Sequence, residues 1–191
     1  MKKIPCFFPV FLSIFCLCFV YSVSVQRNLS SNLLRLHVVA NSNSPIDQRI
    51  KLGVRDRILE KSEKDFPEIA EMEVAAQEYL DTIGAPYHAE VAWEKCHIPA
   101  KAYKQITLPQ GEYNCVKVTL GNGLGENWWC VAYPPLCYTE SMFGAMTDEG
   151  KEKLYSVLDN EAVLTIAQNG KFNVRFKIVE TIQSIIAKIH Y

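Results

Sequence analysis

The chain begins with a continuous apolar run that ends in small residues. Residues 4–21 carry no charge, Lys2 and Lys3 precede them, and the Ser-Val-Ser of residues 22–24 follows. A positive start, an apolar run and a small-x-small exit, in that order, are typical of an export signal. The run is close to the roughly 20 residues that span a bilayer, so an uncleaved N-terminal anchor is the alternative. We assign residues 1–24 to a signal peptide or anchor.

The hydrophobic pattern next predicts a buried strand and an amphipathic helix. Residues 33–40 are apolar and β-branched toward their end, which is typical of a buried strand. Ser44 fits a helix N-cap, Pro45 the first helical position, and Asp47 the positive end of the helix dipole. We therefore expect a helix over residues 45–61. Its buried stripe comprises Ile46, Ile50, Val54 and Ile58, and its exposed face carries Arg49, Lys51, Arg55, Arg57 and Lys61.

Helical periodicity recurs in three later segments. A second helix is predicted to begin near Asp65, where Glu68 three residues later completes a capping box. Residues 147–158 predict a short helix, and residues 174–189 predict a final amphipathic helix. The buried stripe expected for the second helix comprises Ile69, Met72, Ala76, Tyr79 and Ile83.

Alternation of apolar and polar residues predicts two strands, over residues 88–98 and 113–120. Cys96 and Cys115 fall on the polar faces of these strands. If the strands pair antiparallel with the cysteines opposite each other, their Cβ atoms come within disulfide reach. Residues 127–133 form the next predicted strand. The glycine-rich stretch before it fits a hairpin connection, because a phosphate-binding loop would need a following helix and a Lys-Ser/Thr ending.

Together these elements predict an α+β fold, with a small, mainly antiparallel sheet and helices packed against it. We expect a short linker over residues 25–32 and a single exported globular domain over residues 33–191. Residues 162–167 fit either a helix or a strand. About 165 residues after the export segment are enough for one domain with a hydrophobic core.

Composition narrows the possible functions. The net charge of −1, with 20 basic and 21 acidic residues, provides no basic surface for nucleic acid, and we expect no cofactor. Three of the seven cysteines lie in the export segment, which leaves Cys96, Cys115, Cys130 and Cys137. An even number in an exported chain indicates disulfide pairing, with three connectivities open. A zinc site is the competing interpretation, and the lack of any C-x2-C spacing disfavours it.

Four polar residues gather where the first strand meets the first helix: His37, Asn41, Ser42 and Asp47. A nucleophilic or acid–base site would need a serine within about 3 Å of a base, and the sequence gives no such pairing. Asn and Ser also fit turn positions, and a histidine on a buried strand fits a core imidazole.

The other histidines and cysteines have no diagnostic spacing. Cys130 with His97 would mimic a thiol-protease pair, but an exported cysteine close to another is expected to be oxidised. No two histidines have the i, i+4 spacing of a metal site. The histidines are His37, His88, His97 and His190. We therefore expect no metal and no catalytic residue.

Two long stretches carry a family resemblance. They are LRLHVVANSNSPIDQRIKLGVRDRIL, at residues 34–59, and LPQGEYNCVKVTLGNGLGENWWCVAYPPLC, at residues 108–137. They resemble stage II sporulation protein R of endospore-forming bacteria, whose pattern includes H-V-x-A-N-S-x-S-P, V-R-D, L-P-x-G-E-Y and N-W-W-C-V-x-x-P-P-L-C. The chain departs from this pattern over residues 96–101, and Cys96 and Cys115 are additional to it.

The resemblance implies a signal rather than a catalyst. It implies that the protein is made in the forespore and secreted across the forespore membrane into the intermembrane space. There it would trigger a membrane-embedded aspartic protease of the mother cell, which cleaves a sigma-factor precursor. Membrane contact would be limited to the N-terminal segment, if that segment is not cleaved. The alternatives are a secreted hydrolase that acts on cell-wall material through the His37–Asp47 junction, and an envelope scaffold.

The stretch GENWWCVAYPPLC, residues 125–137, adds an aromatic corner. Closing a loop from Cys130 to Cys137 would remove chain entropy equivalent to about 2–3 kcal/mol. Adjacent strand residues point to opposite faces, so one tryptophan would enter the core. The other would be either an exposed interface anchor or buried as well. We expect the partner surface to combine this corner with the strand–helix junction. Its candidate residues are His37, Asn41, Ser42, Asp47, Arg55, Trp128 and Trp129.

Overall fold

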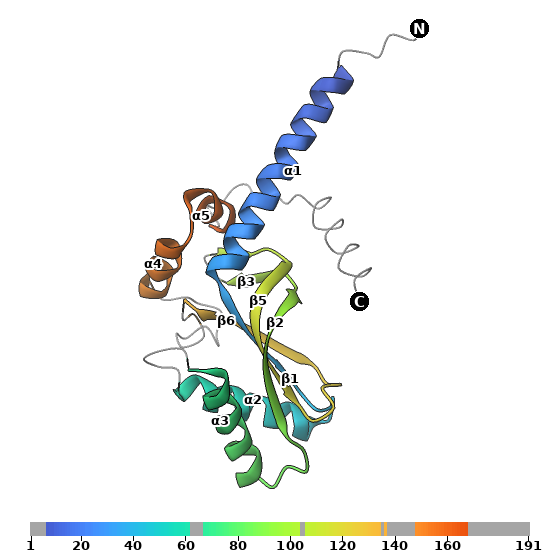
Figure 1. The fold of residues 1–191 in the computed structure, drawn as a ribbon, viewed down its shortest axis with the longest axis vertical. Helices are drawn as coiled ribbons and strands as arrows, with labels where there is room; N and C mark the ends of the chain where they lie inside the picture. Colours follow the sequence, from blue (N-terminus) through green and yellow to red (C-terminus); the bar gives the residue numbers. More distant parts are fainter. Residues whose placement is uncertain (1–6, 62–66, 104–105, 135, 137–147, 168–191) are drawn as a thin grey trace.

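The computed structural model has the α+β fold that the sequence predicts (Figure 1). It describes residues 7–61, 67–103, 106–134, 136 and 148–167. In this part of the chain, four strands form a mixed sheet in the order β2-β5-β1-β6, and β3 and β4 form a separate small sheet. Helices pack on both faces of the main sheet.

The main sheet is built around one parallel pair. Its strands are β2 (Ala89–Ile98), β5 (Gly111–Leu120), β1 (Leu34–Val39) and β6 (Asn127–Tyr133). The outer pairs β2–β5 and β1–β6 are antiparallel, whereas β1 and β5 run parallel. Between β1 and β5 the chain passes through α2, α3, β2, β3 and β4, because parallel neighbours need a crossover connection. The small sheet, which the sequence analysis did not predict, pairs β3 (Lys101–Tyr103) with β4 (Ile106–Leu108).

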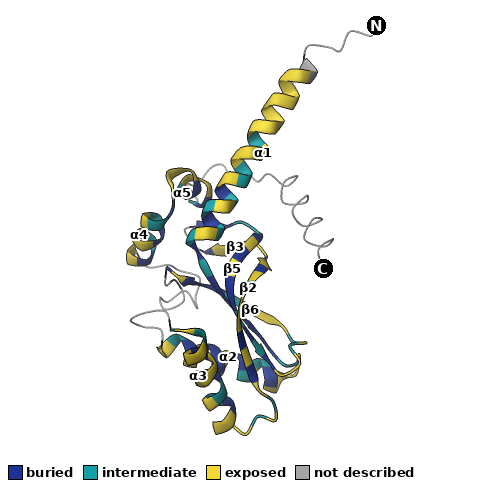
Figure 2. Cartoon of the chain, viewed as in Figure 1, coloured by how far each residue is buried: buried dark blue, intermediate teal, exposed yellow. Residues whose placement is uncertain are grey.

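Two hydrophobic cores lie on opposite faces of the sheet (Figure 2). One packs α2 and α3 against Leu36, Val38 and Val118. The other packs the end of α1, the small sheet, α4 and α5 around Tyr113 and Val131. Since successive strand residues point to opposite faces, β2, β5 and β6 supply both cores from alternate positions.

The helix α1 (Phe7–Asn32) is continuous and leads directly into β1. Within the described residues it is the one helix, over Pro9–Asn32, that is long and apolar enough to cross a membrane. Its N-terminal part projects from the body of the molecule (Figure 1). Residues 25–32, predicted as a linker, are instead its last turns. Val25 and Leu29 are buried in the core because they recur every fourth residue and face the sheet together.

The helix α2 (Pro45–Lys61) has the predicted bounds and the predicted cap, with Asp47 N donating to Ser44 Oγ at 3.1 Å. Its buried face is rotated from the predicted stripe. Ile46 is 61% exposed, whereas Lys51 and Arg55, predicted on the exposed face, are buried. Both are long side chains whose charged ends reach polar or aromatic groups outside the helix, which offsets the cost of burial.

The remaining helices are α3 (Ile69–Thr82), α4 (Asp148–Val157) and α5 (Asn160–Ile166). The acidic cap of α3 lies later than predicted: Glu68 N donates to Glu71 Oε2 at 3.3 Å, and Asp65 falls outside the described residues. The segment that fitted either a helix or a strand is α5, capped by the Asp159 side chain. The helix predicted over residues 174–189 lies outside the described residues.

The burial of α1 in the core leads to a stability prediction. Leu29→Ala should lower the free energy of unfolding by about 2–5 kcal/mol, because it leaves a cavity under a fully buried side chain. The matched control Leu164→Ala, in a helical position that is 70% exposed, should change it by less than about 0.5 kcal/mol. Denaturant unfolding of the full chain in mild detergent, followed by tryptophan fluorescence, measures both. Equal effects would show that the end of α1 is not part of the folded domain.

Candidate functional site

The turn between β1 and α2 is organised by the buried carboxylate of Asp47. Asn41 Nδ2 and Ser42 Oγ donate to Asp47 Oδ2 at 3.0 and 2.5 Å, and the Tyr87 hydroxyl donates to Asp47 Oδ1 at 2.7 Å. The hydrogen bond from Ser42, followed by that from Tyr87, lowers the pKa of Asp47 below its ordinary value of 3.8. Burial and the bond to Asp47 raise the pKa of Tyr87. The carboxylate is therefore held ionised, and the phenol is held as a donor.

The glycine-rich loop between β5 and β6 docks on this turn through its backbone. Asn122 N donates to Asn41 Oδ1 at 2.9 Å, and Glu126 N donates to Asn43 Oδ1 at 2.7 Å. Gly125 N donates to the Ala40 carbonyl at 2.8 Å. We call the docked pair of segments, residues 40–47 and 121–126, the polar junction.

Two buried cationic side chains of α2, Lys51 and Arg55, contact groups outside the helix. Lys51 Nζ donates to the Glu126 carbonyl at 3.0 Å, and burial lowers its pKa. The guanidinium of Arg55 pairs with Asp56 at 2.6 Å and lies 5.1 Å from the centre of the Trp128 ring. Lys51 thus ties α2 to the polar junction, and Arg55 ties it to β6.

Trp128 and Trp129 point to opposite faces of β6, as predicted, and each packs against a different core. Both are partly buried. Trp129 stacks on the His37 ring, with ring centres 5.5 Å apart and planes inclined by 26°. Each indole therefore has an intramolecular partner, so neither is the bare anchor that one of the two interpretations required.

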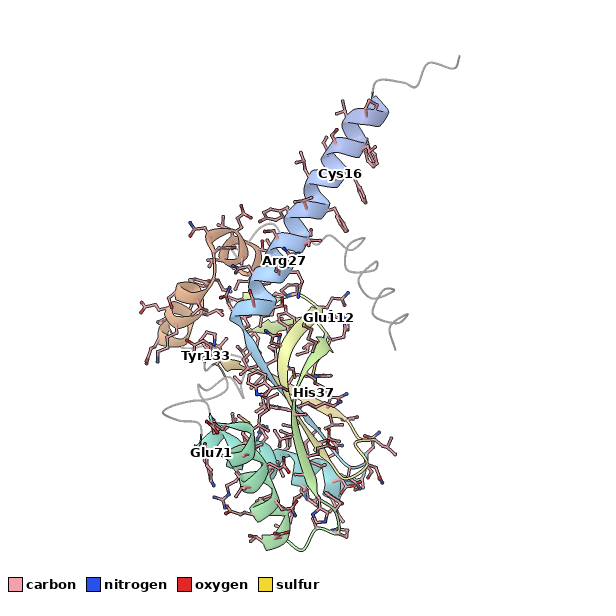
Figure 3. The ribbon with its side chains drawn as sticks, in the orientation of Figure 1. Cys16, Arg27, His37, Glu71, Glu112 and Tyr133 are labelled. Atoms are coloured by element: carbon pink, nitrogen blue, oxygen red, sulfur yellow. The ribbon has the colours of Figure 1, made fainter. Side chains whose placement is uncertain are left out.

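His37 lies on β1 within the sheet (Figure 3), whereas Asp47 lies in the first turn of α2. Its Nε2 hydrogen-bonds Asn127 Oδ1 at 2.7 Å, and its Nδ1 lies 3.6 Å from Cys96 Sγ. None of the hydrogen bonds of Asp47 involves His37. The structure therefore does not bring together the histidine and the acid that the hydrolase alternative combined.

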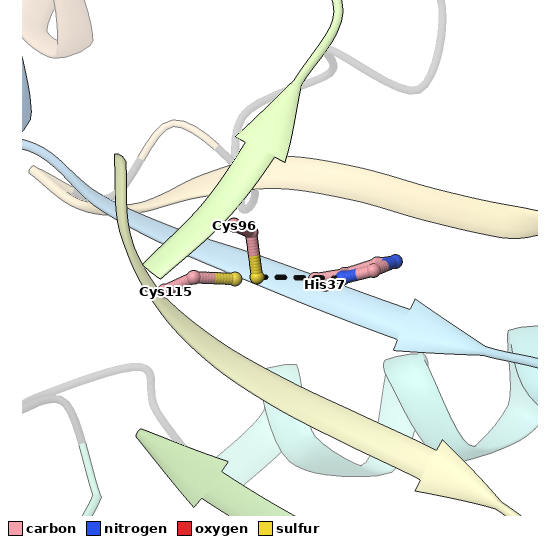
Figure 4. Close-up of side chains that lie close together, drawn as sticks. All are labelled: His37, Cys96 and Cys115. Carbon is pink, nitrogen blue, oxygen red and sulfur yellow. Dashed lines mark hydrogen bonds between the residues drawn. The ribbon is translucent and has the colours of Figure 1, made fainter. Parts of the chain in front are cut away.

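Cys96, Cys115 and His37 meet on one face of the sheet (Figure 4). Cys96 and Cys115 are free thiols, so the predicted bridge between them is absent from the structure. The register explains this: Cys115 faces Glu94 on β2, and Cys96 faces Tyr113, so the cysteines are diagonal rather than opposite. Hydrogen bonding with Cys115, and then with His37, lowers the pKa of Cys96 to about 6. The bond with Cys96, together with burial, raises the pKa of Cys115.

Cys130 is disulfide-bonded. Its predicted partner Cys137 lies outside the described residues, so the Cys130–Cys137 pairing stays a prediction. A disulfide sulfur is not a thiolate nucleophile, which removes the thiol-protease interpretation of Cys130 with His97.

These features describe a small α+β domain attached to an apolar N-terminal helix, with a tightly hydrogen-bonded polar surface. The chain belongs to the stage II sporulation protein R family, whose profile matches residues 30–142. It is 34% identical over 145 residues to stage II sporulation protein R of Bacillus subtilis (strain 168). That alignment covers 69% of this chain and 65% of the relative, so less than two thirds of the relative is spanned. No solved structure matches the chain significantly. The matched names describe a sporulation protein and not an enzyme.

The sequence analysis did not predict several contacts of the site. Tyr87 lies far along the chain from Asp47, and only the fold joins them. The approach of His37 to Cys96 and Cys115 depends on the strand order, which no local pattern gives. Gly125 had a usable signal, because three glycines in one short loop indicate close backbone approach.

Asp47 leads to a prediction about pH. Its pKa is lower in the folded chain, so its contribution to stability is complete above its ordinary value of 3.8 and is lost as the pH falls toward the lowered value. Asp47→Asn should cost about 1–3 kcal/mol of unfolding free energy at neutral pH, and the difference from wild type should shrink below pH 4. Urea unfolding between pH 7 and pH 2.5 measures it. Glu90→Gln removes an exposed carboxylate and should show no such trend; a constant Asp47→Asn difference would contradict the assignment.

The docking of the glycine-rich loop leads to a second prediction for this site. A Cβ on Gly125 would overlap the Ser42 carbonyl oxygen, a backbone atom that cannot rotate away. Gly125→Ala should therefore destabilise the fold by about 1–3 kcal/mol and increase hydrogen exchange at residues 40–47. The control Asn122→Ala changes an exposed side chain of the same loop and keeps the backbone donor to Asn41. If both variants exchange like wild type, the loop is not docked as described.

Proposed function

We propose that this protein is an exported signal that activates a membrane-embedded aspartic protease of the mother cell, which then cleaves a sigma-factor precursor. The observation that carries the proposal is family membership over residues 30–142. This matched region contains the whole main sheet, the polar junction and both tryptophans. The apolar helix α1 supports secretion across the forespore membrane into the intermembrane space.

The polar junction is the recognition surface that we favour. Its hydrogen bonds fix the backbone of two segments, and two of its own apolar side chains face solvent: Leu124 is 76% exposed and Ile46 is 61% exposed. Large exposed apolar side chains on a rigid frame are suited to partner binding, since little conformational entropy is lost when they are covered. Asn41, Ser42 and Asp47 then act by holding the frame rather than by touching the partner.

The protein would act in this scheme without catalysis of its own. The polar junction contains a serine bonded to a carboxylate, Ser42 to Asp47, but the described hydrogen bonds bring no imidazole to that serine. A serine nucleophile needs such a base within hydrogen-bond reach. This geometry favours the signal over the secreted hydrolase.

Reconstitution tests the proposal. The full chain, the membrane protease and a tagged sigma-factor precursor are co-expressed in a bacterium that lacks all three. Cleavage of the precursor should require both the protease and this protein. Cleavage without the protease would assign the activity to this chain, and unchanged cleavage without this chain would remove its role as a signal.

Surface variants test the recognition surface in the same assay. Leu124→Asp and Ile46→Asp should reduce precursor cleavage at least about tenfold, which corresponds to about 1.4 kcal/mol of binding free energy. Leu164→Asp changes an exposed position of α5, at the other end of the domain (Figure 1); it is the matched control and should retain cleavage. Circular dichroism and secretion levels establish that each variant folds. Wild-type cleavage by both junction variants would place the recognition surface elsewhere.

A further inference from the structure

Side chains from three strands of the sheet form a cluster of possible metal ligands. The proposed function assigns no role to this cluster. The ligand atoms of His37 on β1, Cys96 on β2 and Cys115 on β5 all lie within 4.8 Å of one another. Figure 4 shows the two sulfur atoms and the imidazole directed toward each other. Both cysteines are buried, and His37 is partly buried. Two thiols and an imidazole are the ligand types that Zn(II) prefers in proteins.

The separation between Cys96 Sγ and His37 Nδ1 matches that between two ligands of a tetrahedral zinc ion. With Zn–S bonds of about 2.3 Å and Zn–N bonds of about 2.0–2.1 Å, neighbouring S and N ligands lie about 3.6 Å apart. Cys96 Sγ lies 3.6 Å from His37 Nδ1, and it lies 3.5 Å from Glu94 Oε1. Glu94 stands directly opposite Cys115 in the strand register. The group whose ligand atoms all lie within 4.8 Å of one another comprises His37, Cys96 and Cys115 only, so the Glu94 carboxylate has to turn further toward them to act as a fourth ligand.

The imidazole is already oriented as a metal ligand. A metal-binding histidine usually donates its other ring N–H to a carboxylate or carbonyl oxygen, which fixes the tautomer. Here Nε2 lies 2.7 Å from Asn127 Oδ1, so Nε2 carries the proton and Nδ1 presents a lone pair to Cys96. The stack with Trp129 holds the plane of the ring.

The buried guanidinium of Arg35 lies next to the cluster and would be stabilised by a nearby negative charge. Arg35 is fully buried and is the register neighbour of Cys115 on β1. Its Nε donates to the Cys130 carbonyl, but Nη1 and Nη2 have no hydrogen-bond partner, and no described carboxylate pairs with it. Two thiolates and one carboxylate around Zn(II) carry a net charge of −1, which balances this guanidinium.

We propose that His37 Nδ1, Cys96 Sγ and Cys115 Sγ hold a Zn(II) ion that ties β1, β2 and β5 together, and that the nearby Glu94 carboxylate turns toward the metal to complete a tetrahedral site. Each thiol loses its proton to solvent when the metal binds. Lys117, which pairs with Glu94 at 3.0 Å, then orients the carboxylate from outside the coordination sphere. With Glu94 as the fourth ligand the coordination sphere is filled, which makes the site structural rather than catalytic.

A second chemistry uses some of the same atoms. Cys96, His37 and Asn127 are spaced like a Cys-His-Asn nucleophilic triad. Cys96 is only 6% exposed and has the Cys115 thiol against it, so a substrate would have to displace buried groups to reach the sulfur. The second thiol and the carboxylate have no role in a triad, whereas both are ligands in the metal site.

Metal titration of the full chain tests the proposal. The protein, in detergent and reducing buffer, is stripped with a chelator and titrated with Zn(II) or Co(II). About one equivalent should bind, and Co(II) should give thiolate charge-transfer absorption and tetrahedral d–d bands. Zn(II) should raise the unfolding temperature and protect Cys96 and Cys115 from alkylation, as mapped by mass spectrometry. Failure of the reduced protein to bind stoichiometrically would overturn the proposal.

Variants separate the site from other thiols of the chain. Cys115→Ser and His37→Ala should abolish stoichiometric binding, and Asn127→Ala should weaken it about 10–100-fold. His97→Ala, which removes an exposed neighbour of Cys96 on the opposite face of β2, should bind like wild type. Circular dichroism identifies any variant that fails to fold, and alkylation protection in wild type gives a result that needs no variant. Retained binding by folded His37→Ala and Cys115→Ser, or rapid Cys96 alkylation in saturating Zn(II), would overturn the assignment.

Discussion

Asp47 is a buried carboxylate that accepts hydrogen bonds from the turn after β1 and from Tyr87, immediately before β2. A buried charge is costly unless donors compensate it, so this arrangement holds only when all the segments are in place. The side-chain amide of Asn41 links this turn to the loop between β5 and β6, because it donates to Asp47 and accepts from the backbone of that loop. One ionised group therefore fixes the relative positions of β1, α2 and that loop.

Much of the fold was readable from local pattern. The bounds of β1, β5, β6 and α2 follow from apolar runs, alternation and the Ser44 cap, all of which act within a few residues. The sequence analysis misplaced the buried face of α2, since periodicity treats Lys51 and Arg55 as surface charges. Their burial depends on the Glu126 carbonyl and the Trp128 ring, which are distant in the chain and adjacent only in the fold.

The positions of Cys96 and Cys115 also could not be predicted fully from local sequence pattern. Residue parity correctly placed Cys96 and Cys115 on one face of neighbouring antiparallel strands, but parity does not fix register. The actual register puts them on a diagonal, and the parallel strand β1 then brings His37 to the same point. A histidine and a cysteine 59 positions apart have no spacing that a metal motif would detect. Residues 40–47 of the polar junction were easier to locate because they lie close together in sequence, whereas their contact with residues 121–126 depends on the fold.

The edge strand β6 is held from both faces, and this is relevant to the proposed role of the protein as a non-catalytic signal. Trp128 meets Arg55 of α2 on one face, and Trp129 meets His37 of β1 on the other. Asn127, at the start of the strand, also holds His37 through a hydrogen bond. A metal ion on His37 would therefore stiffen the same strand that leads out of the polar junction. Rigidity would favour the proposed role, since a surface ordered before binding loses less entropy when a partner covers it.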